Sequence, residues 1–392
     1  MNFNKYKISE VGSVITGKTP PTKNEEYFSV EKDKYLFITP RDMNINSKYI
    51  SETERYLTDF VTDKFSSLII DNKSICVSCI GTVGKVFIPK QLSITNQQIN
   101  SITNLKDFCN FDYLYYYLKQ NYKKIQSVAG GTTMPIVNKS SFEGIEIELP
   151  SLSDQLKIVK ILNKIDEKIE LNNEINNNLS EQIKSIYNEI FTEFIDYKRL
   201  DEISNVTIGK TPPRSEQECF TTDKNDVKWI SISDLGKSGM FIFDTSEKLT
   251  QEAVDKYNVK VIPKDTVILS FKLTVGRTGF TTEDMTTNEA IAHFDLNNKE
   301  LNNYLYCTLT YYNYSDLGST SSIATAINSK IVKSIKIGIP SDEQLNKFNN
   351  LTSAMFKTIK NNESENIKLS ELRDTILPKL MNGEIDLDKI EL

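Results

Sequence analysis

Two long stretches of the chain carry apolar residues at the heptad spacing that is typical of paired helices. Apolar residues recur at two positions of a seven-residue repeat through residues 151–195, and residues 341–382 show the same pattern. Each stretch follows a proline and opens with a serine and a polar residue three positions later, which is a capping-box start. Such sustained seams favour two long helices that pack against each other. The predicted seam residues include Ile165, Ile169, Leu179, Ile183, Met355, Ile359 and Leu369.

Asparagine interrupts the centre of each seam. Asn172 and Asn176 take seam positions in the first stretch, and Asn362 and Asn366 take them in the second, at a constant offset of 190 residues. These defects would face each other if the helices ran antiparallel, and a buried asparagine layer fixes register at a cost in stability. The alternative is solvated low-complexity sequence, because the surrounding residues are also rich in asparagine. We favour the interpretation in which the asparagines set the register.

The remaining sequence alternates short apolar segments with turn residues. Residues 74–80 and 265–271 are β-branched and bounded by turn residues, which predicts buried strands. Residues 113–122 and 304–312 predict short helices rich in aromatic side chains. Both parts of the chain therefore mix strands and helices.

These segments recur because the chain contains two copies of one long unit. The sequence GKTPP at 17–21 returns at 209–213, and the same offset of 192 residues carries TVGK at 82–85 onto TVGR at 274–277. A constant offset over many positions indicates a duplication, and two long copies are too few for a solenoid. Two copies of one unit suggest a protein that reads two similar, separated targets.

The predicted fold is α+β, with two mixed α/β domains joined by two long antiparallel coiled-coil helices and related by a pseudo-twofold internal repeat. The predicted boundaries are 1–150 for the first domain, 151–195 for the central helix, 196–340 for the second domain, 341–382 for the C-terminal helix and 383–392 for a tail.

The composition is that of a globular protein. Hydrophobic residues make up 39% and charged residues 26% of the 392 positions, and no apolar run reaches membrane-spanning length. No secretory leader opens the chain, so we expect a cytoplasmic protein that does not bind membranes. Among the five cysteines only Cys76 and Cys79 have metal-like spacing, and they lie in an apolar run. We therefore expect buried, reduced thiols and no metal site.

The net charge of −6 argues mildly against a nucleic-acid binder, but the charge is unevenly distributed. Residues 151–195 hold 5 basic and 8 acidic residues, and residues 341–392 hold 7 and 10, so these two stretches account for the whole excess of −6. The repeated units are therefore nearly neutral. Each can still hold a local basic face, or can rely on a partner for phosphate-binding charge.

The chain lacks the residue sets of common catalytic sites. Its one histidine, His293, stands between apolar neighbours, and no Ser/His/Asp or Cys/His set is duplicated although most other features are. The GTVGK segment at 81–85 has too few residues between its glycines for a phosphate-binding loop, which predicts a turn instead. No methyltransferase Pro-Pro motif and no glycine-rich cofactor fingerprint is present. We expect a non-catalytic chain without catalytic residues.

Polar and basic residues remain at matched loop positions of the two copies. Glutamine, asparagine, arginine and glutamate are the side chains that read base edges, and lysine binds phosphate. Positions that the copies share suit backbone contacts or internal turns, whereas positions that differ suit different DNA sequences. The simpler explanation for each residue is a surface turn. The candidate DNA-binding residues are Lys18, Thr19, Arg41, Asp42, Lys85, Gln97 and Gln98 in the first copy and Lys210, Thr211, Ser233, Asp234, Arg277 and Glu289 in the second.

With these motifs in view, the chain resembles the specificity subunit of a Type I restriction–modification system. The resemblance covers essentially the whole length. It rests on Gly-Lys-Thr-Pro in each half, on the Val-Gly-Lys/Arg turns, on the strand–Pro–Ser–helix junctions at 148–155 and 338–344, and on the ending at 377–385.

The resemblance implies two target-recognition domains that each read half of a split site in double-stranded DNA. It also implies two methyltransferase subunits docked on the helices, which carry S-adenosylmethionine and methylate adenine, and restriction subunits that use ATP and Mg to translocate and cleave. No cofactor is expected on this chain itself. The alternatives are the specificity subunit of an orphan adenine methyltransferase without a nuclease, a structural coiled-coil scaffold with no DNA role, and a hidden nuclease or fused methyltransferase.

Overall fold

The computed structural model describes residues 1–43, 48–131, 134–194, 196–317 and 327–387. It divides the chain into two compact units, the first made of residues 1–169 and 368–392 and the second of residues 170–367. The predicted tail lies partly outside the described residues, because 388–392 are not among them.

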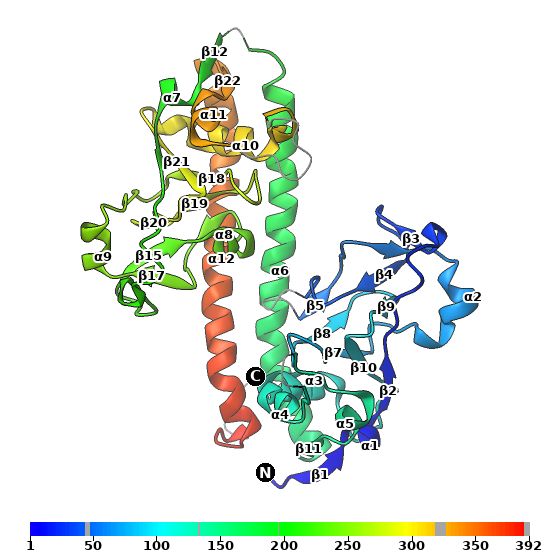
Figure 1. Cartoon of the computed structure of the whole chain (residues 1–392). Coiled ribbons are helices and arrows are strands. Elements are labelled where there is room, and N and C mark those ends of the chain that lie inside the picture. The colour runs from blue at the N-terminus through cyan, green and yellow to red at the C-terminus, as the bar shows by residue number, and fades with distance from the viewer. Residues whose placement is uncertain (44–47, 132–133, 195, 318–326, 388–392) are drawn as a thin grey trace. The chain divides into compact units, whose positions relative to one another are not determined.

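The first unit consists of a globular part followed by the start of a long helix (Figure 1). Its strands are β1 (Asn4–Lys7), β2 (Ser13–Thr16), β3 (Phe28–Ser29), β4 (Tyr35–Ile38), β5 (Tyr49–Ile50), β6 (Tyr56–Leu57), β7 (Ile75–Ser78), β8 (Val86–Pro89), β9 (Ser93–Thr95), β10 (Ile99–Thr103) and β11 (Glu146–Leu149). Its helices are α1 (Ile8–Val11), α2 (Val61–Phe65), α3 (Phe111–Gln120), α4 (Tyr122–Ser127), α5 (Lys139–Glu143) and the first half of α6 (Leu152–Ile190).

The second unit repeats this series of strands. Its strands are β12 (Asp196–Arg199), β13 (Ser204–Ile208), β14 (Phe220–Thr221), β15 (Val227–Ile230), β16 (Phe241–Ile242), β17 (Glu247–Leu249), β18 (Val267–Ser270), β19 (Thr278–Thr281), β20 (Thr286–Thr287), β21 (Ile291–Leu296) and β22 (Lys336–Ile339). Its helices are α7 (Leu200–Ile203), α8 (Ile232–Lys237), α9 (Gln251–Lys256), α10 (Asn302–Tyr311), α11 (Ser329–Ser334) and α12 (Asp342–Met381), which ends in the first unit.

The sheets of the two units have the same strand order. The first unit has a five-stranded sheet β2-β10-β7-β8-β5, a four-stranded sheet β3-β6-β4-β9 and the pair β1-β11. The second has β13-β21-β18-β19-β16, β14-β17-β15-β20 and the pair β12-β22, which are the same strands displaced by one repeat. The predicted α+β fold with a duplicated mixed unit is confirmed.

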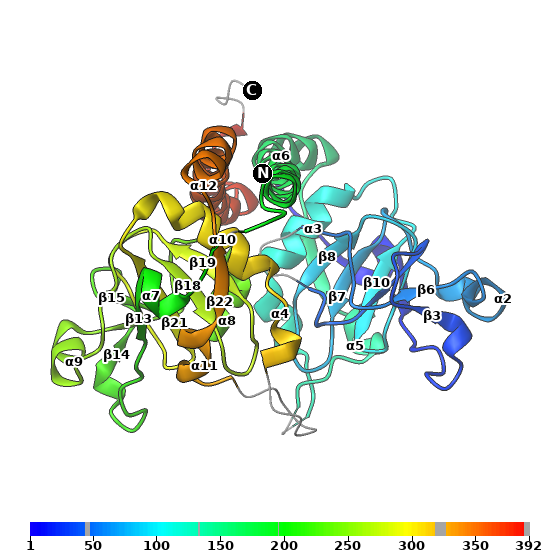
Figure 2. The ribbon, with the colours of Figure 1, turned by 90° about the horizontal axis from the view of Figure 1, so that it is seen from above.

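A short helix links each five-stranded sheet to a long helix (Figure 2). In the first unit the aromatic face of α3 packs against the sheet and against Ile158 and Leu162 of α6. In the second unit α10 packs in the same way against the sheet and against Phe348 and Phe356 of α12. Burial of each large side chain contributes roughly 1.5–3 kcal/mol, so these layers hold the long helices firmly in place.

Each long helix begins directly after a serine, α6 at Leu152 and α12 at Asp342. The backbone N–H of Asp154 donates to the hydroxyl of Ser151 over 3.2 Å, and the N–H of Gln344 donates to Ser341 over the same distance. The Gln344 side chain also accepts from the backbone of Ser341, which completes a capping box.

In the second unit the helices run antiparallel and meet at the predicted asparagine layer. Asn172 is fully buried and donates to the side chains of Asn366 over 2.9 Å and Glu365 over 2.8 Å. Asn362 donates to Asn176 over 2.9 Å. The offset of 190 residues exchanges these two asparagine pairs, so this layer has local twofold symmetry. The asparagines are thus paired across the helices, and the predicted antiparallel packing is confirmed.

In the first unit a buried ion pair joins the same two helices. Arg373 donates to Asp166 over 2.8 Å, and both side chains are less than a tenth exposed. The Tyr116 hydroxyl of α3 donates to the second oxygen of the same carboxylate over 2.5 Å. Buried Lys48 extends the polar cluster through an ion pair with Asp112 at 2.8 Å. The second unit has apolar residues at the equivalent helix positions, because the repeat offset places Ile183 and Phe356 there and both are buried.

In the second unit α12 carries a half-buried carboxylate, that of Glu363. The backbone N–H groups of Met240 and Phe241 donate to Glu363 over 2.8 and 2.9 Å. Burial raises the pKa of Glu363 to about 7, and these two hydrogen bonds offset only part of that rise. The folded protein therefore binds a proton at this position more tightly than the unfolded chain does.

We predict that Arg373→Met lowers the free energy of unfolding by about 3–5 kcal/mol, because it leaves Asp166 buried without its cation. Combining Asp166→Phe with Arg373→Ile installs the pair of the second unit and should restore most of that stability. Urea unfolding measures both. The control is Arg199→Met, because Arg199 forms an exposed ion pair with Asp201 and its removal should change stability much less. Equal losses for the two arginine variants would contradict the prediction.

We predict a pH dependence of stability from Glu363. The pKa of Glu363 is near 4.5 in the unfolded chain and is raised to about 7 in the folded protein. The stability that protonated Glu363 contributes is therefore fully present below pH 4.5 and is lost as the pH rises through about 7. Glu363→Gln removes the titration, so between pH 5 and pH 8 its stability relative to wild type should rise by about 2 kcal/mol. Unfolding at the two pH values tests this, with exposed Glu371→Gln as the control. A difference that does not change with pH would refute it.

Candidate nucleic-acid interface

In each unit two loops meet closely at one edge of the five-stranded sheet. Gly17 follows β2, and its N–H donates to the carbonyl of Ile99 over 3.0 Å. Gly209 follows β13 and donates in the same way to Ile291 over 3.1 Å. A Cβ atom at Gly17 would lie 2.2 Å from the Thr95 hydroxyl, and Gly209 is equally crowded. Glycine is therefore required here so that the Gly-Lys-Thr loop can reach the Thr-Asn turn.

In each unit the two loops are joined by an equivalent side-chain hydrogen bond. The Thr19 hydroxyl donates to Oε1 of Gln97 over 2.7 Å, across 78 residues of sequence. The Thr211 hydroxyl donates to Oε2 of Glu289 across the same separation. The acceptor side chains are exposed at the rim of each sheet. The structure thus brings four of the predicted residues together as two equivalent pairs.

The predicted lysines of these loops lie beside the two pairs. Lys18 and Lys210 are both exposed, and the ammonium group of Lys210 donates to the backbone carbonyl of Tyr257 over 2.6 Å. Their place next to each threonine suits contacts with a phosphate backbone.

The second predicted pair of cations has internal partners. Lys85 follows the turn between β7 and β8, and its ammonium group donates to the carbonyl of Met43 over 3.3 Å. Arg277 follows the turn between β18 and β19 and donates to the carbonyl of Ile232 over 3.1 Å. Both side chains are half-buried. Lys85 therefore ties its turn to the loop that follows β4, and Arg277 ties its turn to the start of α8.

The predicted aspartates are also occupied within the protein. Asp42 is half-buried and accepts two hydrogen bonds from Thr39 and one from the backbone of Glu54. Asp234 is buried, and its two oxygens accept from the backbone and hydroxyl groups of Ser231 and Ser246. These carboxylates hold equivalent loops in shape, so we leave them out of the proposed DNA contacts.

The other predicted residues differ in exposure. Arg41 and Ser233 are exposed next to the two aspartates. Gln98 is half-buried and accepts from the Asn96 side chain over 2.9 Å, and its counterpart in the second unit is the buried Ala290. Gln98 therefore supports the turn, whereas Arg41 and Ser233 are available to a ligand.

Leu273 is an exposed turn residue that the sequence analysis did not select as a candidate. It is 93% exposed at the tip of the turn between β18 and β19, with a φ of 62°. The equivalent residue of the first unit is Gly81, with a φ of 74°. A left-handed leucine costs roughly 1–2 kcal/mol, and an exposed side chain recovers none of it by packing. The substitution of leucine for glycine in a repeated turn was the available signal in the sequence.

Several cations surround the carboxylate of the second unit. Burial would raise the pKa of Glu289, but the hydrogen bond from Thr211 and the charges of Lys272 and Arg214 bring it below its ordinary value. Arg214 also pairs with Glu247 at 2.8 Å. Glu289 is therefore ionised at neutral pH and acts only as an acceptor.

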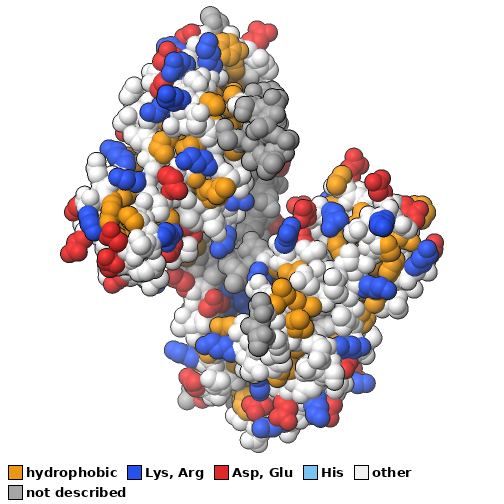
Figure 3. All heavy atoms as spheres, in the orientation of Figure 1, with side chains coloured by type: hydrophobic (Ala, Val, Ile, Leu, Met, Phe, Trp, Pro, Cys, Tyr) orange, Lys and Arg blue, Asp and Glu red, His pale blue; other side chains and the backbone are white. Residues whose placement is uncertain are grey.

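Charge on the visible face of each unit is mixed. Figure 3 shows basic and acidic side chains interleaved, with no single large basic patch on this face. Local pairs of loops, rather than a broad positive surface, therefore define the candidate interface.

The residues with reactive side chains are internal. His293 is fully buried between the hydroxyls of Thr207 and Thr287, at 2.9 and 2.6 Å from its two ring nitrogens, and burial lowers its pKa to about 3. All five cysteines are buried and free. Burial raises the pKa of Cys76 to about 12 and that of Cys79 to about 11, so both are protonated thiols.

Within the described ranges, no cluster of three or more His, Cys, Asp or Glu side chains is arranged to hold a metal ion. No described helix is long and apolar enough to cross a membrane.

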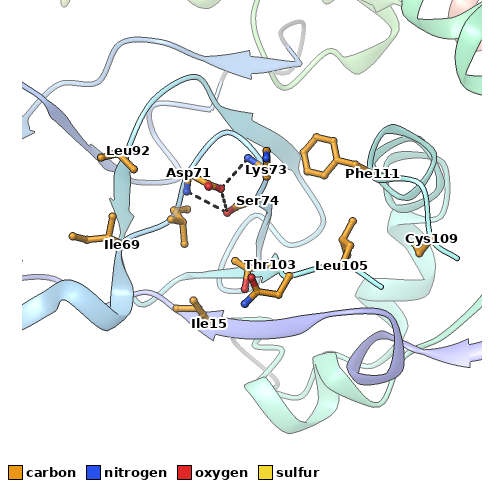
Figure 4. Close-up of a pocket in the computed structure, with 12 residues that line it drawn as sticks. Ile15, Ile69, Asp71, Lys73, Ser74, Leu92, Thr103, Leu105, Cys109 and Phe111 are labelled. Atoms are coloured by element: carbon orange, nitrogen blue, oxygen red, sulfur yellow. Dashed lines mark hydrogen bonds between the residues drawn. The ribbon is translucent and has the colours of Figure 1, made fainter. Parts of the chain in front are cut away.

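A hollow of about 650 Å³ in the first unit has no chemistry of its own (Figure 4). It is lined by side chains such as Ile15 and Phe111 and by a turn that contains Asp71. The Asp71 carboxylate accepts from the backbone of Lys73 over 2.9 Å and from the hydroxyl of Ser74 over 3.2 Å. Its polar group therefore serves the turn, and we assign the hollow no binding role.

The chain is similar over nearly its full length to proteins of one family. A family model described as the Type I restriction modification DNA specificity domain matches residues 1–181 and again residues 194–372. The MjaIX specificity subunit of a Type I restriction enzyme from Methanocaldococcus jannaschii is 27% identical, over 98% of this chain and 94% of that protein. The HindI specificity subunit from Haemophilus influenzae is 30% identical over 48% of this chain and 41% of that protein.

A solved structure has the same fold. The crystal structure of a Type I restriction–modification S subunit from M. genitalium matches with a TM-score of 0.54 and 18% identity, over 97% of this chain and 96% of that one. The duplicated units and the two matches of the family model agree in position along the chain. The chain therefore belongs to the family of Type I restriction–modification DNA specificity proteins.

Proposed function

We propose that this chain is the non-catalytic DNA-recognition subunit of a Type I restriction–modification complex. One observation carries the proposal: the two units keep the same loop scaffold but differ in the exposed side chains at its rim. Gln97 is matched by Glu289, and Gly81 is matched by Leu273. Different exposed side chains on one shared scaffold would allow the two units to read different DNA sequences.

Each unit would bind one half of a split site in double-stranded DNA. We propose that Lys18 and Lys210 contact phosphates, which positions a protein without specifying sequence. The exposed rim side chains, together with Arg41 and Ser233, would contact base edges. Because these side chains differ, the two half-sites should be different sequences and the whole site should not be a palindrome.

The length of the paired helices bears on the distance between the half-sites. α6 contains 39 residues and α12 contains 40, which at about 1.5 Å per residue is roughly 60 Å. That is somewhat less than two turns of duplex at about 34–36 Å per turn. After allowance for the width of each unit, the unread spacer should be about 5–8 base pairs.

The catalytic parts of the complex would belong to partners. We propose two methyltransferase subunits that carry S-adenosylmethionine and dock on the helices, and restriction subunits that use ATP and Mg. The complex would act in the cytoplasm, where it meets the chromosome.

We predict that the chain co-expressed with its methyltransferase produces a two-part, asymmetric pattern of adenine methylation with an unread spacer of about 5–8 base pairs. Long-read sequencing that detects methyladenine measures the motif. The purified chain with S-adenosylmethionine alone should transfer no methyl groups, and serves as the control. A continuous or palindromic motif would contradict the two-reader proposal, and a complex that ignores DNA would favour the scaffold alternative.

We predict that Leu273→Gly leaves stability unchanged or raises it by up to about 1 kcal/mol, because it removes a strained left-handed leucine. The same change should weaken binding of the assembled complex to its site by about tenfold, because an apolar contact with DNA is lost. Urea unfolding and DNA titration measure the two effects. The matched control is Gly81→Ala in the first unit, which adds strain without adding an apolar side chain of that size. Unchanged affinity for Leu273→Gly would show that the leucine does not touch DNA.

A further inference from the structure

One side-chain hydrogen bond occurs in both units, and only its acceptor differs. Thr19 donates to Gln97 in the first unit, and Thr211 donates to Glu289 in the second. The two loops that make this bond keep their sequence. GKTPP, which contains the donor, and the Thr-Asn pair directly before the acceptor both recur at the same offset. Duplication has therefore preserved the donor and its support while the exposed acceptor changed from an amide to a carboxylate.

The bond restricts how each acceptor can meet a ligand. The threonine hydroxyl binds one oxygen of each side chain, so the remaining polar atoms face a fixed direction at the rim. For Gln97 these are the amide nitrogen, which donates two hydrogen bonds, and the second lone pair of the oxygen. For Glu289 the remaining atom is the other carboxylate oxygen, which only accepts. Fixing an exposed side chain before binding lowers the entropy lost on binding.

An ionised carboxylate such as Glu289 is electrostatically unfavourable on a surface that binds DNA. Phosphates repel it, and the charges of Lys272 and Arg214 reduce that repulsion only in part. A hydrogen-bond donor on the DNA must offset the remaining repulsion. In the major groove the donors are the amino groups of cytosine and adenine, and a side chain that only accepts is suited to cytosine N4. An amide that both donates and accepts is suited to adenine N6 and N7.

We propose that Gln97 and Glu289 are equivalent base-reading residues, which read adenine in the first half-site and cytosine in the second. Thr19 and Thr211 are their positioning residues. The inference rests on the proposed function of DNA recognition, and deepens it by naming the base that each unit reads at this position.

The test is an exchange of acceptors in the full chain, co-expressed with its methyltransferase, with methylated adenines mapped by long-read sequencing. Glu289→Gln should change one cytosine of the second half-site to adenine and leave every other letter unchanged. Gln97→Glu should make the reverse change in the first half-site. The original letter should lose preference by about tenfold to a hundredfold in each case. Glu252→Gln, on an exposed face of α9, is the matched control and should leave the whole motif unchanged.

A positioning role for threonine has its own signature. Thr211→Val should relax the preference at that one base pair while the first half-site and the amount of assembled complex stay the same, and Thr211→Ser should restore it. This variant also serves if Glu289→Gln fails to assemble.

The outcomes distinguish the base-reading inference from the proposed function of DNA recognition. If the wild-type complex gives a two-part motif and the exchange leaves its letters unchanged, the base-reading inference is overturned and the proposed function stands. If the wild-type complex gives no two-part motif, the proposed function fails and the inference fails with it.

Discussion

The pairing of α6 with α12 supports the rest of the structure, because each helix contributes side chains to the cores of both units. Ile158 and Leu377 come from different helices and share the core of the first unit, and Ile183 and Phe348 do the same in the second. The recognition loops stand on sheets that reach these helices through α3 and α10. A shift of one helix along the other by a single turn would therefore disturb both cores at once.

Two different sets of polar contacts hold α6 and α12 together. The second unit uses a layer of amides, in which Asn172 and Asn366 bond directly. The first unit uses the buried ion pair of Asp166 and Arg373, supported by Tyr116. Buried polar groups contribute little net stability, but they are costly to misalign because an unpaired partner stays desolvated. Register is thus specified by penalties for wrong pairings, and the apolar seam provides the attraction.

The duplication also separates support from recognition. Gly17 and Gly209 both lie too close to a Thr-Asn turn to carry a Cβ atom, and Asp42 and Asp234 both accept a hydrogen bond from the residue three positions earlier. These positions cannot change without loss of the local structure. The exposed acceptors Gln97 and Glu289 can differ without loss of the local structure, because the hydrogen bond from each threonine requires only an oxygen atom. A family that must recognise different DNA sequences on one fold gains from such an arrangement.

The sequence by itself determined the architecture. The repeat offset, the two heptad seams and the asparagine defects predicted two mixed units with antiparallel helices, because periodic patterns depend only on residues close in the chain. The asymmetry between Asp166 with Arg373 and Ile183 with Phe356 was also present in the sequence, but periodicity alone does not reveal which residues face each other.

Only the tertiary structure decided which of the candidate loop residues are exposed and which are bound within the protein. Lys85, Arg277 and Asp234 look as suitable for DNA as Lys18 or Gln97 when they are read along the chain, yet their polar groups are bound to distant backbone or hydroxyl groups. Leu273 looked like an ordinary turn residue until its exposure and left-handed backbone were known. The physical reason is that a hydrogen bond depends on distance in space. Thr211 and Glu289 are 78 residues apart in sequence, and only the folded sheet brings them together.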